Sequence, residues 1–242
     1  DQLMPELEGM DDAYGGCQLS KNVPPRIVFV GDSHMLHYRN AIWRIFPREP
    51  VAMITRVICF PFTESRFRER PECGKKTSVL IKYLQHAQTV DTVVISGYYA
   101  YLMSGDFEKS GANWRIPKVP DAVDIASFKE NATHFLSALT GAGKRVVLMK
   151  DIPDLDFNIE TCFDLRPVVI SRENLRRDCS IPRQEFMQRI QPYDAVLDDV
   201  LKQFPQVVVF DPRPLFCQGD RCQATDGELP YYFNGDHVNW HG

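Results

Sequence analysis

The sequence lacks the features that mark several common classes of protein. No stretch contains the run of about eighteen apolar residues that a membrane span needs, and no charged-then-apolar leader opens the chain. No basic patch is present either, because 28 lysines and arginines are outnumbered by 32 acidic residues, for a net charge of -4. These absences argue against nucleic acid as a partner.

The chain also lacks an initiator methionine, and it opens on an acidic, glycine-containing segment, DQLMPELEGMDDAYGG. We therefore interpret it as a piece of a longer protein. The chain is expected to form one domain, because 44% of the 242 residues are hydrophobic and no low-complexity tract interrupts them.

No Cys-x-x-Cys pair occurs, which argues against zinc, and we expect no metal site. Six of the seven cysteines instead form three close pairs in polar, turn-like segments, and the seventh, Cys17, is left over. Each pair would close a short loop, which favours disulfides and an oxidising compartment such as a periplasm; the alternative is six unrelated buried thiols. The expected pairs are Cys59 with Cys73, Cys162 with Cys179, and Cys217 with Cys222.

Short apolar runs alternate with helical patterns along the chain. Five runs rich in Val, Ile and Phe predict strands buried on both faces, at residues 26–30, 51–57, 92–96, 145–149 and 206–210. Helices are predicted at residues 34–46, 77–88, 124–140 and 185–204. This alternation predicts a three-layer, flavodoxin-like α/β/α domain with a five-stranded parallel sheet. Ligand chemistry then belongs at the carboxyl ends of the strands, which are followed by Ser33, Cys59, Gly97, Asp151 and Asp211.

The first of these positions lies in RIVFVGDSHMLHYRNAI, where an apolar run breaks at a glycine turn before a helix. A serine at that helix start is well placed to become a nucleophile, and the alternative is that Ser33 only caps the helix. Asp32 is expected to order the turn, and His37 and Arg39 to lie on a solvated helix face.

The last strand is followed by a second polar segment, PYYFNGDHVNWHG. It crowds Asn234, Asp236, His237, Asn239 and His241 into eight positions on the same sheet edge as Ser33. The alternative is a surface loop with incidental histidines.

Together, VGDSH and the distant DHVN resemble blocks I and V of the SGNH (GDSL-like) hydrolase superfamily. More narrowly, the chain resembles the SGNH domain fused behind the acyltransferase-3 membrane domain of bacterial surface-polysaccharide O-acetyltransferases, the O-antigen acetyltransferases among them. CFPF after the second strand and FCQGDRC before the tyrosine-rich ending match that subgroup. The resemblance covers residues 26–242, which would be the catalytic domain, and implies that residues 1–25 are a linker or extension. It also implies a periplasmic domain of an inner-membrane protein, tethered to an upstream acyltransferase-3 domain and acting on an envelope polysaccharide such as lipopolysaccharide O-antigen.

The resemblance also implies residue roles. Ser33 would be the nucleophile and His237 the general base, while Asn234 stands where the family has the aspartate that orients the histidine. Asp236 is expected to point away from His237, because the two are adjacent in an extended loop. The oxyanion donors would be the backbone N–H groups of Ser33 and Gly97, since the family's Gly-x-Asn-Asp block is absent.

Two further side chains are candidates for contact with substrate. His34 projects about 100° around a helix from Ser33, so it is expected either to face the substrate groove or to pack. Tyr98 belongs to a set of tyrosines that would form either a sugar-stacking platform or ordinary core margin. That set comprises Tyr98, Tyr99, Tyr101, Tyr231 and Tyr232.

The resemblance therefore implies a serine-dependent O-acyltransferase, for acetyl groups, that passes the acyl group through Ser33 to a sugar hydroxyl. No bound cofactor is expected, because acetyl derived from acetyl-CoA would be supplied by the membrane domain, and the isolated piece would show weak esterase activity. One alternative is a carbohydrate acetyl esterase of the same superfamily. Another is a non-catalytic carbohydrate-binding module that kept the fold and lost the chemistry.

Overall fold

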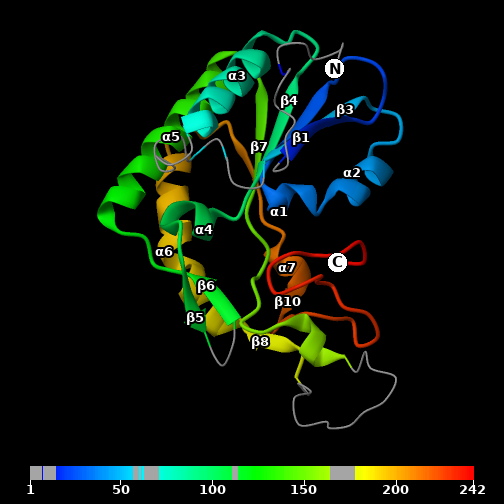
Figure 1. Ribbon diagram of the computed structural model, residues 1–242, viewed down its shortest axis with the longest axis vertical. Helices are drawn as coiled ribbons and strands as arrows, with labels where there is room; N and C mark the ends of the chain where they lie inside the picture. Colours follow the sequence, from blue (N-terminus) through cyan, green and yellow to red (C-terminus); the bar gives the residue numbers. More distant parts are fainter. Residues whose placement is uncertain are drawn as a thin grey trace.

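The structure, a computed structural model, describes residues 7, 15–56, 60, 62, 71–110, 114–163 and 178–242. Figure 1 shows a sheet flanked by helices in the upper part of the molecule and a smaller lobe below it. The predicted α/β class is confirmed, since the main sheet is largely parallel and helices cover both of its faces.

The main sheet has six strands, one more than predicted. Five of them correspond to the predicted apolar runs and pair in parallel. The prediction of burial on both faces is wrong for β9 at the sheet edge, because its residues Val208, Val209 and Phe210 are exposed. The sixth, β1, pairs antiparallel with β3 at the sheet edge. Its sequence, GGCQL, has no continuous apolar run, and the pattern therefore does not predict a strand there. The strands, in spatial order, are β1 (Gly15–Leu19), β3 (Val51–Arg56), β2 (Ile27–Gly31), β4 (Thr92–Ser96), β7 (Arg145–Met149) and β9 (Val208–Phe210).

The strand β1 lies within the segment expected to be a linker or extension. The division into residues 1–25 and 26–242 otherwise stays a prediction. Cys17 lies in the middle of β1, opposite Ile54 of β3.

The two faces of the sheet carry different helices. Val28 and Val30 of β2 belong to the core under α3 and α5, whereas Phe29 between them packs with Met35 and Ile42 of α1 and α2. This alternation is the period of two expected of a strand buried on both faces. The helices are α1 (Ser33–Leu36), α2 (Arg39–Ile45), α3 (Pro71–His86), α4 (Tyr99–Ser104), α5 (Ala122–Gly141), α6 (Arg183–Leu201) and α7 (Arg213–Phe216).

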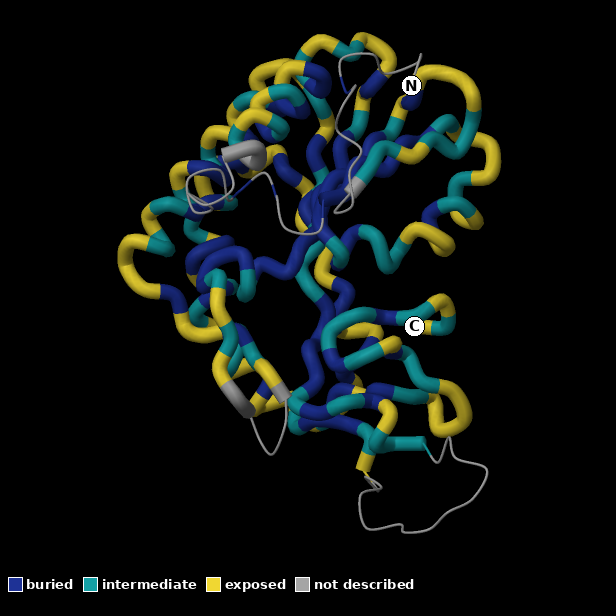
Figure 2. The backbone as a smooth tube through the Cα atoms, in the orientation of Figure 1, coloured by how far each residue is buried: buried dark blue, intermediate teal, exposed yellow. Residues whose placement is uncertain are grey.

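The smaller lobe has its own apolar core and its own small sheets. Figure 2 shows that the buried chain continues from the centre of the main sheet into this lobe. Its core includes Ile152, Leu155, Phe216, Tyr232 and Val238. The minor elements are β5 (Phe107–Ser110) paired with β6 (Trp114–Pro117), the 3-10 helix η2 (Ile159–Cys162), and a sheet of β10 (Cys217–Gln218), β11 (Arg221–Gln223) and β8 (Ser180–Pro182).

Two disulfides staple the smaller lobe. Cys162 is bonded to Cys179 and Cys217 to Cys222, which confirms both predicted pairings. The predicted pair of Cys59 with Cys73 lies outside the described residues and side chains. In the part of the chain that the structure describes, no helix combines the length and the apolar character needed to cross a bilayer.

Candidate active site

The turn that carries Ser33 joins β2 to α1 and is tied to the end of β4. Asp32 caps α1, and its carboxylate accepts the backbone N–H groups of His34 at 2.7 Å and Tyr98 at 2.9 Å. Asp32 therefore orders the turn, as predicted. Burial raises the pKa of the Asp32 carboxyl, against the opposing effects of nearby His34 and of these two N–H groups.

Gly31 allows this turn to lie against the neighbouring strand. A Cβ added to Gly31 would lie 2.0 Å from the carbonyl oxygen of Ser96 and 2.4 Å from Cβ of Met35. No larger residue fits without separating β2 from β4, so the glycine fixes the position of Ser33 at the carboxyl edge of the sheet. Ser33 itself is half-buried and begins α1.

The second half of the site is a tight loop near the end of the chain. The side-chain oxygen of Asn234 accepts the backbone N–H groups of Asp236 at 3.0 Å and His237 at 2.8 Å. The N–H of Phe233 donates to the carbonyl of His237 at 2.7 Å, and the N–H of Leu155 donates to Gly235 at 2.6 Å. These bonds hold His237 in one position above the core of the smaller lobe.

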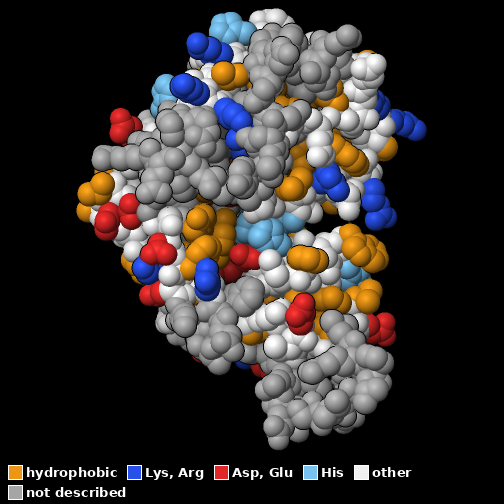
Figure 3. Space-filling view, in the orientation of Figure 1, with side chains coloured by type: hydrophobic (Ala, Val, Ile, Leu, Met, Phe, Trp, Pro, Cys, Tyr) orange, Lys and Arg blue, Asp and Glu red, His pale blue; other side chains and the backbone are white. Residues whose placement is uncertain are grey.

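The structure brings the two segments together, although they are separated by some 200 residues in sequence. The ring of His237 lies 4.6 Å from the ring of His34 and 5.9 Å from that of His37. The N–H of His37 donates to the carbonyl of Ser33, so Ser33 and His37 lie on one side of the α1 turn. Figure 3 shows histidine side chains where the sheet domain meets the smaller lobe.

Among the described residues, no hydrogen bond reaches the Ser33 hydroxyl. Proton transfer between Ser33 and His237 therefore stays a prediction. Catalytic hydrogen bonds are often long before substrate binds, so the arrangement is compatible with that role.

His237 is oriented by the carboxylate of Asp236. Oδ1 of Asp236 lies 2.7 Å from Nδ1 of His237, whereas the side chain of Asn234 lies 3.3 Å from the same nitrogen. The prediction that Asp236 points away is wrong, because the backbone bonds to Asn234 close a turn and fold Asp236 back over the ring. Burial raises the pKa of the Asp236 carboxyl, but the hydrogen bond to His237 and the charge on His34 outweigh it, and the pKa is lowered.

His34 packs beneath His237 and does not line an open groove. Only 1% of its side chain is exposed, its Nδ1 lies 2.8 Å from Oδ1 of Asp151, and its ring stacks on Tyr98 at 4.3 Å. Burial opposes charge on His34, but the attraction and hydrogen bond of Asp151 outweigh it and raise the His34 pKa to about 9. Burial also raises the pKa of Asp151; its carboxyl keeps 20% exposure, and we take the pair as imidazolium and carboxylate. The sequence placed Asp151 at the functional edge of the sheet without giving it a role.

His37 also belongs to the site, and the prediction of a solvated position is wrong. Both of its ring nitrogens are buried without a partner among the described residues. Burial, together with charge on His34 and His237, lowers the His37 pKa far below its ordinary value. The predicted single helix is broken after Leu36, so the helical period used to place His37 does not apply. Arg39 is exposed, as predicted.

The tyrosines do not form one surface. Tyr98, Tyr99 and Tyr232 are buried, which is the core-margin alternative, while Tyr101 and Tyr231 are half-buried. The hydroxyl of Tyr232 donates to the carbonyl of Pro153 at 2.6 Å.

Gly97 is buried between β4 and α4. A Cβ there would lie 2.7 Å from the ring of Phe60. Its role as an oxyanion donor stays a prediction, as does that of the Ser33 N–H.

The histidine cluster is arranged as a hydrogen-bonded network. One ligand atom each of His34, Asp236 and His237 lies within 4.8 Å of the others, so the three could approach a cation. Two ligands of a tetrahedral metal lie about 3.4 Å apart. Asp236 and His237 approach to 2.7 Å, which is a hydrogen-bond distance. The expectation of no metal site stays a prediction.

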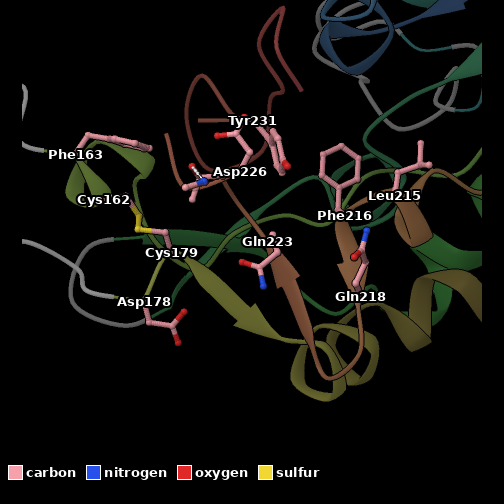
Figure 4. Close-up of a pocket in the computed structure, with 12 residues that line it drawn as sticks. Cys162, Phe163, Asp178, Cys179, Leu215, Phe216, Gln218, Gln223, Asp226 and Tyr231 are labelled. Carbon is pink, nitrogen blue, oxygen red and sulfur yellow. Dashed lines mark hydrogen bonds between the residues drawn. A yellow bond between two sulfur atoms is a disulfide. The ribbon is translucent and has the colours of Figure 1, made fainter. Parts of the chain in front are cut away.

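A cavity of about 690 Å³ lies in the smaller lobe and contains none of the predicted catalytic residues. Figure 4 shows the disulfide of Cys162 and Cys179 at one end of it and Leu215 with Gln218 at the other. A large volume alone does not make this cavity the active site. We therefore place the candidate site at the cluster of His34, His37 and His237 beside Ser33.

A family model and a solved structure are similar to this chain. The model of the family described as "SGNH domain (fused to AT3 domains)" matches residues 4–242. No curated protein matches the chain in sequence. Among solved structures, the chain is similar to the acetyl xylan esterase Est2A from the rumen bacterium Butyrivibrio proteoclasticus, with 8% identity and a TM-score of 0.39. That match covers 79% of this chain and 56% of the esterase chain. The family model spans nearly the whole sequence, and the chain therefore belongs to the family of SGNH domains that are fused to AT3 domains.

Proposed function

We propose that this domain is a serine-dependent O-acyltransferase that passes an acetyl group through Ser33 to a sugar hydroxyl of a cell-envelope polysaccharide. The observation that carries the proposal is the Asp236–His237 pair, which a distant segment brings against the turn of Ser33. A histidine held by a carboxylate beside a serine at a helix start is the arrangement that activates a hydroxyl as a nucleophile.

In the first step His237 takes the proton of the Ser33 hydroxyl as its oxygen attacks the carbonyl carbon of the acyl donor. Asp236 stabilises the imidazolium that forms, and the N–H groups of Ser33 and Gly97 would receive the oxyanion. The intermediate collapses to acyl-Ser33, and His237 returns the proton to the leaving group.

In the second step His237 takes a proton from the acceptor hydroxyl, whose oxygen attacks the acyl-Ser33 carbonyl. The new ester leaves, and the proton returns to the Ser33 oxygen. The two half-reactions share one site, so the kinetics are ping-pong.

The acyl donor in this proposal is acetyl derived from acetyl-CoA and supplied by an upstream acyltransferase-3 domain. The acceptor is a surface glycan such as the O-antigen of lipopolysaccharide. Two disulfides support an extracytoplasmic setting, here the periplasmic face of an inner-membrane protein. Phe233 and Trp240, which flank His237 in sequence, are 76% and 72% exposed and offer flat apolar faces to a sugar ring.

A second candidate is a carbohydrate acetyl esterase, in which water replaces the sugar hydroxyl in the second step. It uses the same residues, so the competition between glycan and water decides between the two. A non-catalytic binding module is the third candidate, and it requires no reactive serine.

The test is covalent labelling followed by turnover. A fluorophosphonate should modify Ser33 of the wild-type protein, and Ser33→Ala should neither be labelled nor hydrolyse a small acetyl ester. Wild-type turnover in Ser33→Ala would refute the nucleophile assignment, and absence of labelling in the wild type would favour the binding module. With the full-length protein and acetyl-CoA, acetyl should appear on the glycan faster than free acetate appears; the reverse order favours the esterase.

A further inference from the structure

A second histidine–carboxylate pair lies beneath the His237 ring, and the acyl-transfer steps above do not use it. The pair is His34 and Asp151, joined at 2.8 Å through Nδ1 of the imidazole. We propose that His34 and Asp151 are positioning residues for His237: the pair supports its ring, and it turns its positive member, the His34 imidazolium, toward that ring. This inference rests on the proposed function, because it concerns the general base of that reaction.

The geometry makes His34 a rigid support. Its backbone N–H is bonded to Asp32, its Nδ1 to Asp151, and its ring is stacked on Tyr98 with 13° between the planes. The His237 ring lies 4.6 Å away at 59°. His237 therefore rests on a side chain that is fixed from three directions.

Two carboxylates act on the His237 ring, and the positive charge of His34 opposes them. The carboxylate of Asp236 touches its ring, and the buried carboxylate of Asp32 interacts with it electrostatically. Both carboxylates stabilise positive charge on the ring that is proposed to take the Ser33 proton. His34 supplies the opposing charge, because its pKa of about 9 makes it an imidazolium at neutral pH.

Other groups facing His34 do not replace this charge. His37 has a strongly lowered pKa and is neutral at pH 7, and the raised pKa of Tyr98 keeps that phenol neutral. The groups that face His34 are Asp32 and His37 from the α1 turn, Tyr98 before α4, Asp151 after β7, and Asp236 and His237 from the terminal loop.

His34 also has an unused donor. Its Nε2 is buried and has no partner among the described residues. A buried, charged histidine with an unsatisfied nitrogen is costly for a structural role, and such groups persist where function requires them.

The experiment removes the pair without leaving a buried charge unpaired. The double variant His34→Gln with Asp151→Asn replaces an ion pair by two amides of similar size. Turnover of a small acetyl ester is measured from pH 5 to 9, beside the wild type. The expected result is a shift of the acid-side midpoint of kcat/KM to higher pH by about one unit, with activity recovering at alkaline pH. A merely structural role would lower activity equally at every pH.

The matched control is His241→Gln. His241, on the same segment, forms a pair with Asp226 at 2.7 Å, and its ring contacts are with Tyr231 and Trp240. Its removal should leave the pH midpoint unchanged, and an equal shift in this control would overturn the proposal.

Three outcomes distinguish failure of the inference about His34 from failure of the proposed function. A folded, active double variant with an unshifted midpoint overturns the inference. If the double variant does not fold, the ¹⁵N-imidazole signals of the wild type are followed with pH, and a neutral His34 at pH 7 overturns the inference as well. Wild-type turnover in Ser33→Ala instead overturns the proposed function, whatever the charge on His34.

Discussion

The contact between Asp236 and His237 can be separated experimentally from that of Asn234. Asp236→Asn keeps the size of the side chain and removes its charge. Asn234→Asp keeps the oxygen that accepts the N–H groups of residues 236 and 237 and adds a charge. Because the carboxylate of Asp236 lies nearer to Nδ1 of His237, at 2.7 Å against 3.3 Å, we expect the first change to dominate.

The size of the effect of Asp236→Asn follows from the distance between Asp236 and the His237 ring and from the exposure of the Asp236 side chain. Two charges about 4 Å apart interact by roughly 4 kcal/mol at an effective dielectric constant of 20. The Asp236 side chain is 19% exposed, so screening by solvent lowers this to about 3 kcal/mol, a rate factor on the order of 100. The imidazolium exists in the transition state, so the loss should appear in kcat. Asn234→Asp should change kcat by less than about threefold, since the side-chain oxygen of residue 234 lies 3.3 Å from Nδ1 of His237 and Asp236 already occupies the closer position.

The assay is hydrolysis of a small acetyl ester at saturating substrate, with both variants checked by their melting temperatures. Loss of a factor near 100 in kcat for Asp236→Asn, with KM nearly unchanged, supports the reasoning. If Asp236→Asn stays within threefold of the wild type while Asn234→Asp gains tenfold or more, the orienting position belongs to Asn234 and the reasoning fails.

Three further predictions concern stability. Gly31→Ala should lower the free energy of unfolding by about 3 kcal/mol, because its Cβ meets the Ser96 carbonyl, and an unchanged urea midpoint would contradict this. Non-reducing mass spectrometry should find Cys162 linked to Cys179, and alkylation of both thiols in untreated protein would refute the pairing. The folded-state pKa of His34 is raised above its ordinary value of 6.5, so its stabilising contribution is complete below pH 6.5 and is lost as pH rises through 9. The free energy of unfolding should fall by about 3 kcal/mol over that window, and a slope equal to that of the double variant lacking the pair would refute the argument.

The sequence predicts the main strands and the two polar segments of the candidate site because both depend on local pattern. Continuous apolar runs identify the parallel strands, of which the central ones are buried and β9 at the edge is exposed. The turn of Ser33 and the loop of His237 stand out because glycine, polar and histidine residues follow such runs. That these two segments meet follows from the shared edge of a parallel sheet.

The remaining errors came from tertiary context. The edge strand at Gly15–Leu19 is defined by its pairing with β3 and carries little apolar signal of its own. The helical period puts His37 on a solvated face, but the helix breaks after Leu36 and the period does not continue to His37. Asp236 was placed by the geometry of an extended loop, whereas the side chain of Asn234 closes that loop into a turn. In each case a long-range or side-chain contact decided the conformation.

The sequence places Asp151 after a predicted strand, at the edge of the sheet where ligand chemistry is expected, but it assigns no role to this residue. Its partnership with His34 depends on the direction in which a side chain beside Ser33 turns, and that direction is set by packing against Tyr98.

The two segments of the candidate site lie far apart along the chain. Ser33 follows β2, whereas Asp236 and His237 come after β9. The hydrogen bonds that order the serine turn and join His34 to Asp151 involve no residue of the 231–241 segment. Under the proposed function, a variant in which residues 231–241 are replaced would therefore keep the serine turn and lose the histidine that activates it.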